Sequence, residues 1–320
     1  MKNRILKTTR VFAGVGLSIG LGWITVRGVD WGLAIDNLSD ASLLLLTVAL
    51  FIFMAAALLR AIRWRLLFLD ERPSVVRLFI VQHEGLGLGN IMPVRIASEL
   101  TQLWILTTRD GVKPSTAVAA IGMERVVDLI SSSSILALAL ILIPEIRPLA
   151  PYVWVTIFFA VAVIIGIKVF EWGGGVLQSR IPFIGSLANS LISLTSDRIL
   201  LTKSLVLSLG YWVLVGISAW VVAIAVDLPV SPVMATLVII GTIFFATTVP
   251  AAPSAIGSFH FAVVHILGLI DIDKSDAFPF AVIIHLLFFI PPTILAAIFL
   301  PREGFSFRKW YPETKGTNLS

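Results

Sequence analysis

The chain has 320 residues, of which 58% are hydrophobic and only 13% are charged, and its mean hydropathy is +0.98. Soluble proteins carry about 25% charged residues, so this composition excludes a water-soluble domain and predicts an integral membrane protein. Cysteine is absent, which excludes disulfides and thiolate sites, and the net charge of +5 is compatible with nucleic acid or anionic lipid as a partner.

Apolar runs long enough to cross a bilayer, which takes about 20 residues, occur along the whole chain. The basic N-terminus and the run after it imitate a secretory signal, but no small-x-small cleavage site follows, so we expect a retained first span. The sequence predicts six full transmembrane helices in an all-α protein, at roughly 11–29, 42–59, 116–143, 150–169, 203–226 and 277–300.

Two further apolar stretches are interrupted at their centres by turn residues. The stretch 78–106 contains the glycine-rich segment from Gly85 to Asn90 followed by Pro93, and the stretch 231–270 contains Pro250, Pro253 and Gly257. A break in the backbone at bilayer depth must be shielded by protein or face water, so we expect two re-entrant hairpins. Paired breaks also suggest an inverted repeat, although two independently kinked helices would give the same pattern.

The basic residues define an orientation. With the N-terminus inside, 19 of the 24 Lys and Arg residues fall in cytoplasmic segments, as the positive-inside rule predicts. We therefore expect a multi-pass protein of the cell membrane with both termini in the cytoplasm. The basic charge is explained by this orientation, and we expect no nucleic-acid partner.

We expect one polytopic membrane domain, 1–320, with internal divisions. A cytoplasmic amphipathic helix within 173–202, in which leucines recur at helical spacing, separates the two halves. The first half is 10–172, the second is 203–300, and 301–320 is a cytoplasmic tail.

Charged side chains inside the predicted membrane segments are the strongest functional candidates, because each costs about 2.5–3.5 kcal/mol on insertion scales. Arg95 and Arg125 could form a cationic pocket for an anionic head group, since a guanidinium binds phosphate bidentately. Their expected counter-ions are Glu99, Glu124 and Asp128. The alternative is a structural clip, in which these groups only neutralise one another and hold helices together.

The remaining polar candidates are weaker. His260 and His265 are five residues apart and lack an acid at metal-ligand spacing, so we expect no metal site, and the histidines serve either in proton relay or in hydrogen bonds between helices. The basic cluster at Arg60, Arg63 and Arg65 is interpreted mainly as an interfacial anchor.

Several motifs together give a resemblance to a known family. They are Arg60-x-x-Arg63-Trp64-Arg65, Asn90-x-x-Pro93-x-Arg95 leading to Glu99, Glu124-Arg125-x-x-Asp128, and Pro253 with Gly257. In this order the chain resembles the transmembrane domain of the lysylphosphatidylglycerol synthase and flippase family, over about residues 10–300. The chain departs from the family pattern at Gln102, where a basic residue is usual, and at His260, where the family has a glutamate.

The resemblance implies movement of lipids between leaflets. The expected substrates are an anionic or aminoacylated phospholipid, or a polyprenyl-phosphate-linked lipid, bound by Asn90, Arg95, Glu99, Glu124, Arg125, Asp128 and His260. We expect a secondary transporter that is not an enzyme, has no cofactor and has membrane lipid as its partner; the sequence leaves a homo-oligomer open. The alternatives are a membrane enzyme acting on a lipid phosphate and a structural or regulatory membrane subunit.

Overall fold

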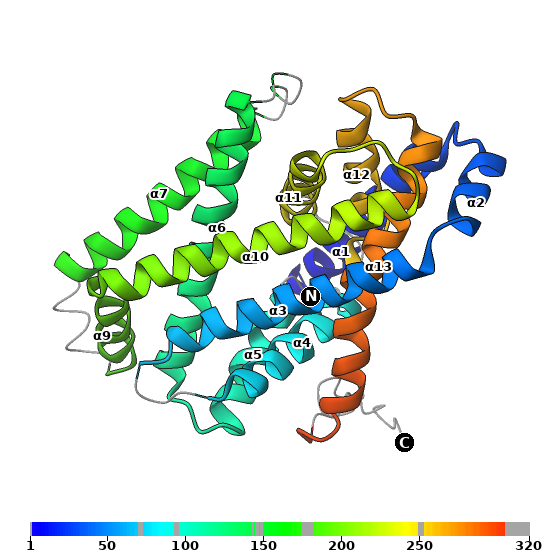
Figure 1. The fold of residues 1–320 in the computed structure, drawn as a ribbon. Helices are drawn as coiled ribbons and strands as arrows, with labels where there is room; N and C mark the ends of the chain where they lie inside the picture. Colours follow the sequence, from blue (N-terminus) through cyan, green and yellow to red (C-terminus); the bar gives the residue numbers. More distant parts are fainter. Residues whose placement is uncertain are drawn as a thin grey trace, which may run out of the picture.

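The computed structural model describes residues 2–69, 73–92, 96–142, 144, 147, 150–173, 182–248 and 253–304. All regular structure in these ranges is helical (Figure 1). The helices are α1 (Lys2–Val26), α2 (Trp31–Ser39), α3 (Leu43–Leu66), α4 (Val75–Ile91), α5 (Ala97–Thr108), α6 (Pro114–Leu142), α7 (Ala150–Gly173), α9 (Pro182–Ser196), α10 (Arg198–Ala225), α11 (Pro232–Thr248), the short 3₁₀ helix η2 (Pro253–Ala255), α12 (Ser258–Gly268) and α13 (Lys274–Phe299).

Each of the six predicted spans coincides with one continuous helix, namely α1, α3, α6, α7, α10 and α13. Within the described residues, three of these helices, α3, α10 and α13, are clearly long and apolar enough to cross a membrane. Their outward side chains agree with this environment, because large apolar residues such as Leu43, Phe51 and Ile294 are exposed. The chain is therefore a multi-pass membrane protein, while the count of six spans stays a prediction.

The first interrupted stretch forms the helix pair α4 and α5, which pack against each other. Arg77, near the start of α4, binds Asp110, just after α5, with 2.8 Å between Nε and Oδ1. The chain therefore enters and leaves this hairpin at the same end of the molecule. The turn itself, 93–95, lies outside the described residues, and insertion of the hairpin into a membrane stays a prediction.

The second interrupted stretch forms α11, η2 and α12. Ser254 and Ala255 in η2 both have positive φ angles, of 60° and 53°, which non-glycine residues rarely adopt. Contacts with two other helices hold this turn: the Ser254 hydroxyl donates to the backbone carbonyl of Asn90 at the end of α4, and Nε2 of His285 on α13 lies 2.9 Å from the Ser254 carbonyl. The break between α11 and α12 thus contacts α4 close to where that helix ends.

Contacts between distant segments group the loops at opposite ends. The backbone N–H of Asp30 donates to the Ser275 hydroxyl at 3.0 Å, and that of Ser42 donates to the Ala225 carbonyl at 3.0 Å, so segments predicted to face outward lie together. Figure 1 shows α2 beside the start of α13 at this end, with α9 at the opposite end. The charge rule still decides which end is cytoplasmic.

Two features of the loops differ from the sequence predictions. The segment between α1 and α3, which is predicted to face outward, contains an additional helix, α2, whose N-cap Asp30 accepts hydrogen bonds from the N–H groups of Gly32 and Leu33 at 2.9 and 3.3 Å. The segment predicted as one amphipathic helix is divided, because α9 ends at Ser196 and Asp197 caps a new helix, α10, that begins at Arg198. Residues 174–181 of that segment, and the tail beyond Gly304, lie outside the described residues.

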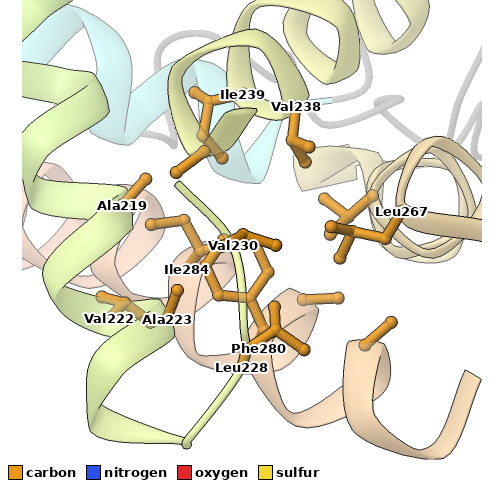
Figure 2. Packing of buried hydrophobic residues seen from close by; sticks show 14 of the residues in the cluster. Ala219, Val222, Ala223, Leu228, Val230, Val238, Ile239, Leu267, Phe280 and Ile284 are labelled. Atoms are coloured by element: carbon orange, nitrogen blue, oxygen red, sulfur yellow. The ribbon is translucent and has the colours of Figure 1, made fainter. Parts of the chain in front are cut away.

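The main hydrophobic core lies in the second half of the chain. Ala219, Val222, Val238, Phe280 and Ile284 are almost completely buried there, from α10, α11 and α13 (Figure 2). Small residues allow close helix packing, as expected between helices in membranes. This core and the α3–α10 contact fix the helices that carry the charged residues.

Candidate functional site

Two arginines of α3 and two acids of α6 form a buried ionic cluster. Arg63 is fully buried, and its guanidinium donates to Asp128 and, at 2.6 Å, to the Ser208 hydroxyl of α10. Arg63 Nη2 also lies 3.3 Å from Glu124 Oε1. Arg60 Nε donates to the same Glu124 oxygen at 2.6 Å, and the Arg60 side chain is 8% exposed. The cluster therefore clips α3, α6 and α10 together.

This cluster corrects the interpretation of the Arg60 to Arg65 motif as an interfacial anchor. Arg60 and Arg63 are three residues apart on α3 and so share one face, which points into the protein. Of the three arginines in this motif, only Arg65 is exposed. Glu124 and Asp128, four residues apart, share the facing side of α6. Two arginines three residues apart on α3 match two acids four residues apart on α6, and this match could have predicted that the two helices pack together.

Arg125 has a different partner from its neighbours in sequence. Its Nη2 lies 2.7 Å from Oε1 of Glu99 on α5, and the side chains of this pair are 41% and 32% exposed. Arg125 Nε and Glu99 Oε2 have no hydrogen-bond partner among the described residues. Arg60 Nη2 and Arg63 Nε of the buried cluster also lack a hydrogen-bond partner among the described residues. The predicted set thus separates by exposure, into a buried cluster of four charged groups and a partly exposed ion pair.

The other predicted site residues lie elsewhere or cannot be placed. Arg95 lies outside the described residues, so the expected pocket with two arginines stays a prediction. Asn90 donates from Nδ2 to the Phe289 carbonyl at 3.3 Å and to the Thr293 hydroxyl at 3.1 Å, both on α13. Asn90 therefore fastens α4 to α13 in this structure.

His260 lies beside a second histidine, His285 of α13, with 4.7 Å between the ring centroids. His285 in turn contacts the Ser254 carbonyl, so His260 belongs to the surroundings of the broken segment. The sequence identified His260 as a candidate but gave no signal that it meets His285. Within the described residues, no group of three His, Asp or Glu side chains is placed to hold a metal ion.

A polar cleft of about 460 Å³ lies at the end of the molecule that carries α9. Ser186, Asn189 and Ser193 of α9 line one side, and Lys113 and Thr116 line the side formed by the start of α6. The polar face of the predicted amphipathic helix thus borders a cleft, while its leucines pack on the core. The charged residues discussed above do not line this cleft.

Comparison with known proteins agrees with the motifs. A family model described as the lysylphosphatidylglycerol synthase TM region matches residues 11–296. A protein named UPF0104 membrane protein from Methanothermobacter thermautotrophicus is 32% identical over 111 residues, which cover 34% of this chain and 33% of that protein. The chain therefore aligns with only about a third of this relative's length. No solved structure matches the chain.

Proposed function

Because the chain belongs to the family of the lysylphosphatidylglycerol synthase TM region, we propose that it moves lipids between membrane leaflets. It acts as a secondary transporter, in a cell membrane, with both termini in the cytoplasm. Its substrate is an anionic or aminoacylated phospholipid, or a polyprenyl-phosphate-linked lipid. The observation that carries the proposal is the accessible ion pair between Arg125 and Glu99.

Arg125 is the group proposed to bind the phosphate of the lipid head group. A guanidinium binds phosphate through two parallel hydrogen bonds, and Nε of Arg125 is not engaged by any described residue. Glu99 neutralises the arginine before substrate binds, so the incoming phosphate exchanges one anionic partner for another. This exchange avoids leaving an unpaired cation inside the protein.

The buried cluster supports a structural role beside this site. Arg60 and Arg63 already share Glu124 and Asp128, and the side chains of the two arginines are at most 8% exposed. We therefore assign Glu124 and Asp128 to the clip that positions α6, and Arg125 on the same helix to substrate. The structural-clip interpretation then applies to Glu124 and Asp128, and the head-group interpretation applies to Arg125.

The contact between α4 and the second broken segment is a further supporting feature. Transporters with paired broken helices place their substrates where the two breaks meet. Here the Ser254 hydroxyl binds the Asn90 carbonyl, and His285 binds the Ser254 carbonyl. We propose that Asn90 and His260 act at this contact by holding the breaks together.

The test is exchange of a fluorescent anionic phospholipid between leaflets of vesicles that contain the purified protein. Arg125→Ala removes charge-assisted hydrogen bonds worth about 1.5–3 kcal/mol, so exchange should slow by about tenfold or more. Arg65→Ala, which removes an exposed arginine on α3, is the matched control and should exchange lipid at the unchanged rate.

Unchanged exchange in Arg125→Ala would refute the assignment of this residue. Absence of exchange in the unaltered protein, with several lipids tried, would instead favour a structural or regulatory membrane subunit. Mass spectrometry of the lipids after incubation separates transport from chemistry, because transport leaves their covalent structure unchanged.

A further inference from the structure

Glu84 of α4 is a buried acid to which the proposed transport site gives no role. Its residue is 0% exposed, and both carboxyl oxygens are buried. Neither oxygen receives a hydrogen bond from any described residue. Glu84 differs in this respect from Glu124, which is equally buried but binds two arginines.

The glycines next to Glu84 show where its side chain lies. A Cβ atom added at Gly85 would lie 2.8 Å from the Ser98 carbonyl of α5, so that face of α4 touches α5. A Cβ at Gly87 would overlap the Pro292 carbonyl and the Ala296 side chain, so that face touches α13. At about 100° per residue, Glu84 lies between these two directions, along the seam where α5 and α13 flank α4.

An ionic cluster forms the end of the same seam. Arg77 lies seven residues before Glu84, about two turns and 10 Å along the helix, and therefore on nearly the same face. It binds Asp110, after α5, and Glu303, after α13, at 2.8 and 2.6 Å. Arg109 adds a hydrogen bond to the Glu303 carbonyl. These side chains are 12–45% exposed, so protons from water reach this cluster.

The surroundings of Glu84 favour its neutral form. A carboxylate that loses water without gaining a donor is strongly destabilised, whereas the protonated acid is much less so. The charged groups that act on it across space are Arg77, Asp110 and Glu303, which together carry one positive and two negative charges. The net charge of these three groups is negative, and it therefore disfavours a negative charge on Glu84.

We propose that Glu84 is a proton-binding site, loaded from the end of the molecule that carries the Arg77 cluster, and that it couples proton movement to movement of the α4–α5 hairpin. A proton from water adds to the carboxylate to give the carboxylic acid, and leaves again when the seam opens. The coupling to lipid rests on the proposed transport function, whereas proton binding does not. An anionic head group that moves together with one proton carries one negative charge less across the membrane.

Infrared spectroscopy tests proton binding directly, through the carbonyl stretching band that only a protonated carboxyl group gives. The unaltered protein should show this band at neutral pH and lose it in Glu84→Gln. Glu99→Gln is the matched control, because Glu99 lies 2.7 Å from the Arg125 guanidinium and its replacement should leave the band unchanged. Glutamine mimics the protonated acid, so Glu84→Gln should also unfold at an unchanged temperature.

Two outcomes would overturn the proton site: a band that Glu84→Gln leaves unchanged, or a clear loss of thermal stability in this variant, which would mean that a hidden cation holds the carboxylate. Coupling is tested separately, by lipid exchange in vesicles with and without a pH difference. The pH difference should change the exchange rate severalfold in the unaltered protein and have no effect in Glu84→Gln. Retained sensitivity in the variant would refute coupling, while absence of exchange in the unaltered protein would refute the transport function and leave the infrared result valid.

Discussion

Replacing Arg63 with methionine should reveal how strongly the buried clip stabilises the fold. Arg63 is fully buried and binds Asp128, Ser208 and Glu124. Removing one partner of a buried ion pair typically costs about 3–5 kcal/mol, because the other charge stays buried without compensation. Arg60 still lies 2.6 Å from Glu124 but 3.8 Å from Asp128, so Asp128 loses most. We expect a loss near the lower end, about 3 kcal/mol.

The measurement is the free energy of unfolding of the purified protein in mixed micelles, followed by helix content as denaturing detergent increases. Arg65→Met is the matched control, since it removes an exposed arginine two residues away and should change stability by no more than about 0.5 kcal/mol. A second variant joins Arg63→Met to Asp128→Leu. Replacing both partners by apolar residues removes the orphaned charge, so this double variant should be more stable than the sum of the single changes predicts.

Two results would refute this reasoning. A loss in Arg63→Met as small as that in Arg65→Met would mean that the cluster contributes nothing to the fold. Strict additivity in the double variant would mean that Arg63 and Asp128 do not act on each other. In either case Glu124 and Asp128 would return to the candidates for substrate binding.

Two further predictions concern the second broken segment. Gly257 has a φ of +88°, and a Cβ atom there would overlap the Ser18 carbonyl of α1. Gly257→Ala should therefore lower the free energy of unfolding by more than about 1 kcal/mol. Gly22→Ala is the control, because a Cβ atom at Gly22 makes an ordinary contact at 3.5 Å. Ser254→Ala removes the hydrogen bond to the Asn90 carbonyl, so we expect the free energy of unfolding to fall by about 1 kcal/mol. The amide hydrogens at the end of α4 should also exchange faster with solvent. An unchanged rate of amide hydrogen exchange there would show that the two broken segments are not linked.

The sequence predicted the helices well because apolar length and helix breakers are local signals. The predicted spans coincide with continuous helices, and each interrupted stretch divides into two helices. The glycine-rich segment from Gly85 to Asn90 was wrongly predicted to be a turn, because it continues α4 to Ile91 and its glycines allow α5 and α13 to approach closely. The helix α2 was missed because it is only 9 residues long and amounts to little more than two turns in an otherwise polar loop. The signal that marked its start, an aspartate at an N-cap position, is common in loops that are not helical.

The partners of the charged residues could not be predicted from spacing along one helix. Glu124, Arg125 and Asp128 occupy neighbouring positions on α6, which suggested that they neutralise one another. In the structure Arg125 turns to Glu99 of α5, whereas the acids turn to α3. Helical spacing fixes the direction of a side chain on its own helix, but the identity of the helix that lies in that direction depends on packing across more than 60 residues of sequence.

One structural element carries a residue of each proposed site, namely Glu99, the partner of Arg125 at the head-group site, and the proton-binding Glu84. Glu99 and Glu84 lie on the two helices of the α4–α5 hairpin, whereas α3, α6 and α10 are clipped together by buried charges and contribute the fixed side of the site. The hairpin packs through Gly87 on α13 close to Pro291 and Pro292. Each proline removes a backbone donor from the helix, so α13 is weakened where α4 rests on it. A bend of α13 at these prolines would carry α4 with it, open the seam at Glu84 and shift Glu99 relative to Arg125, and one motion would thereby couple both sites.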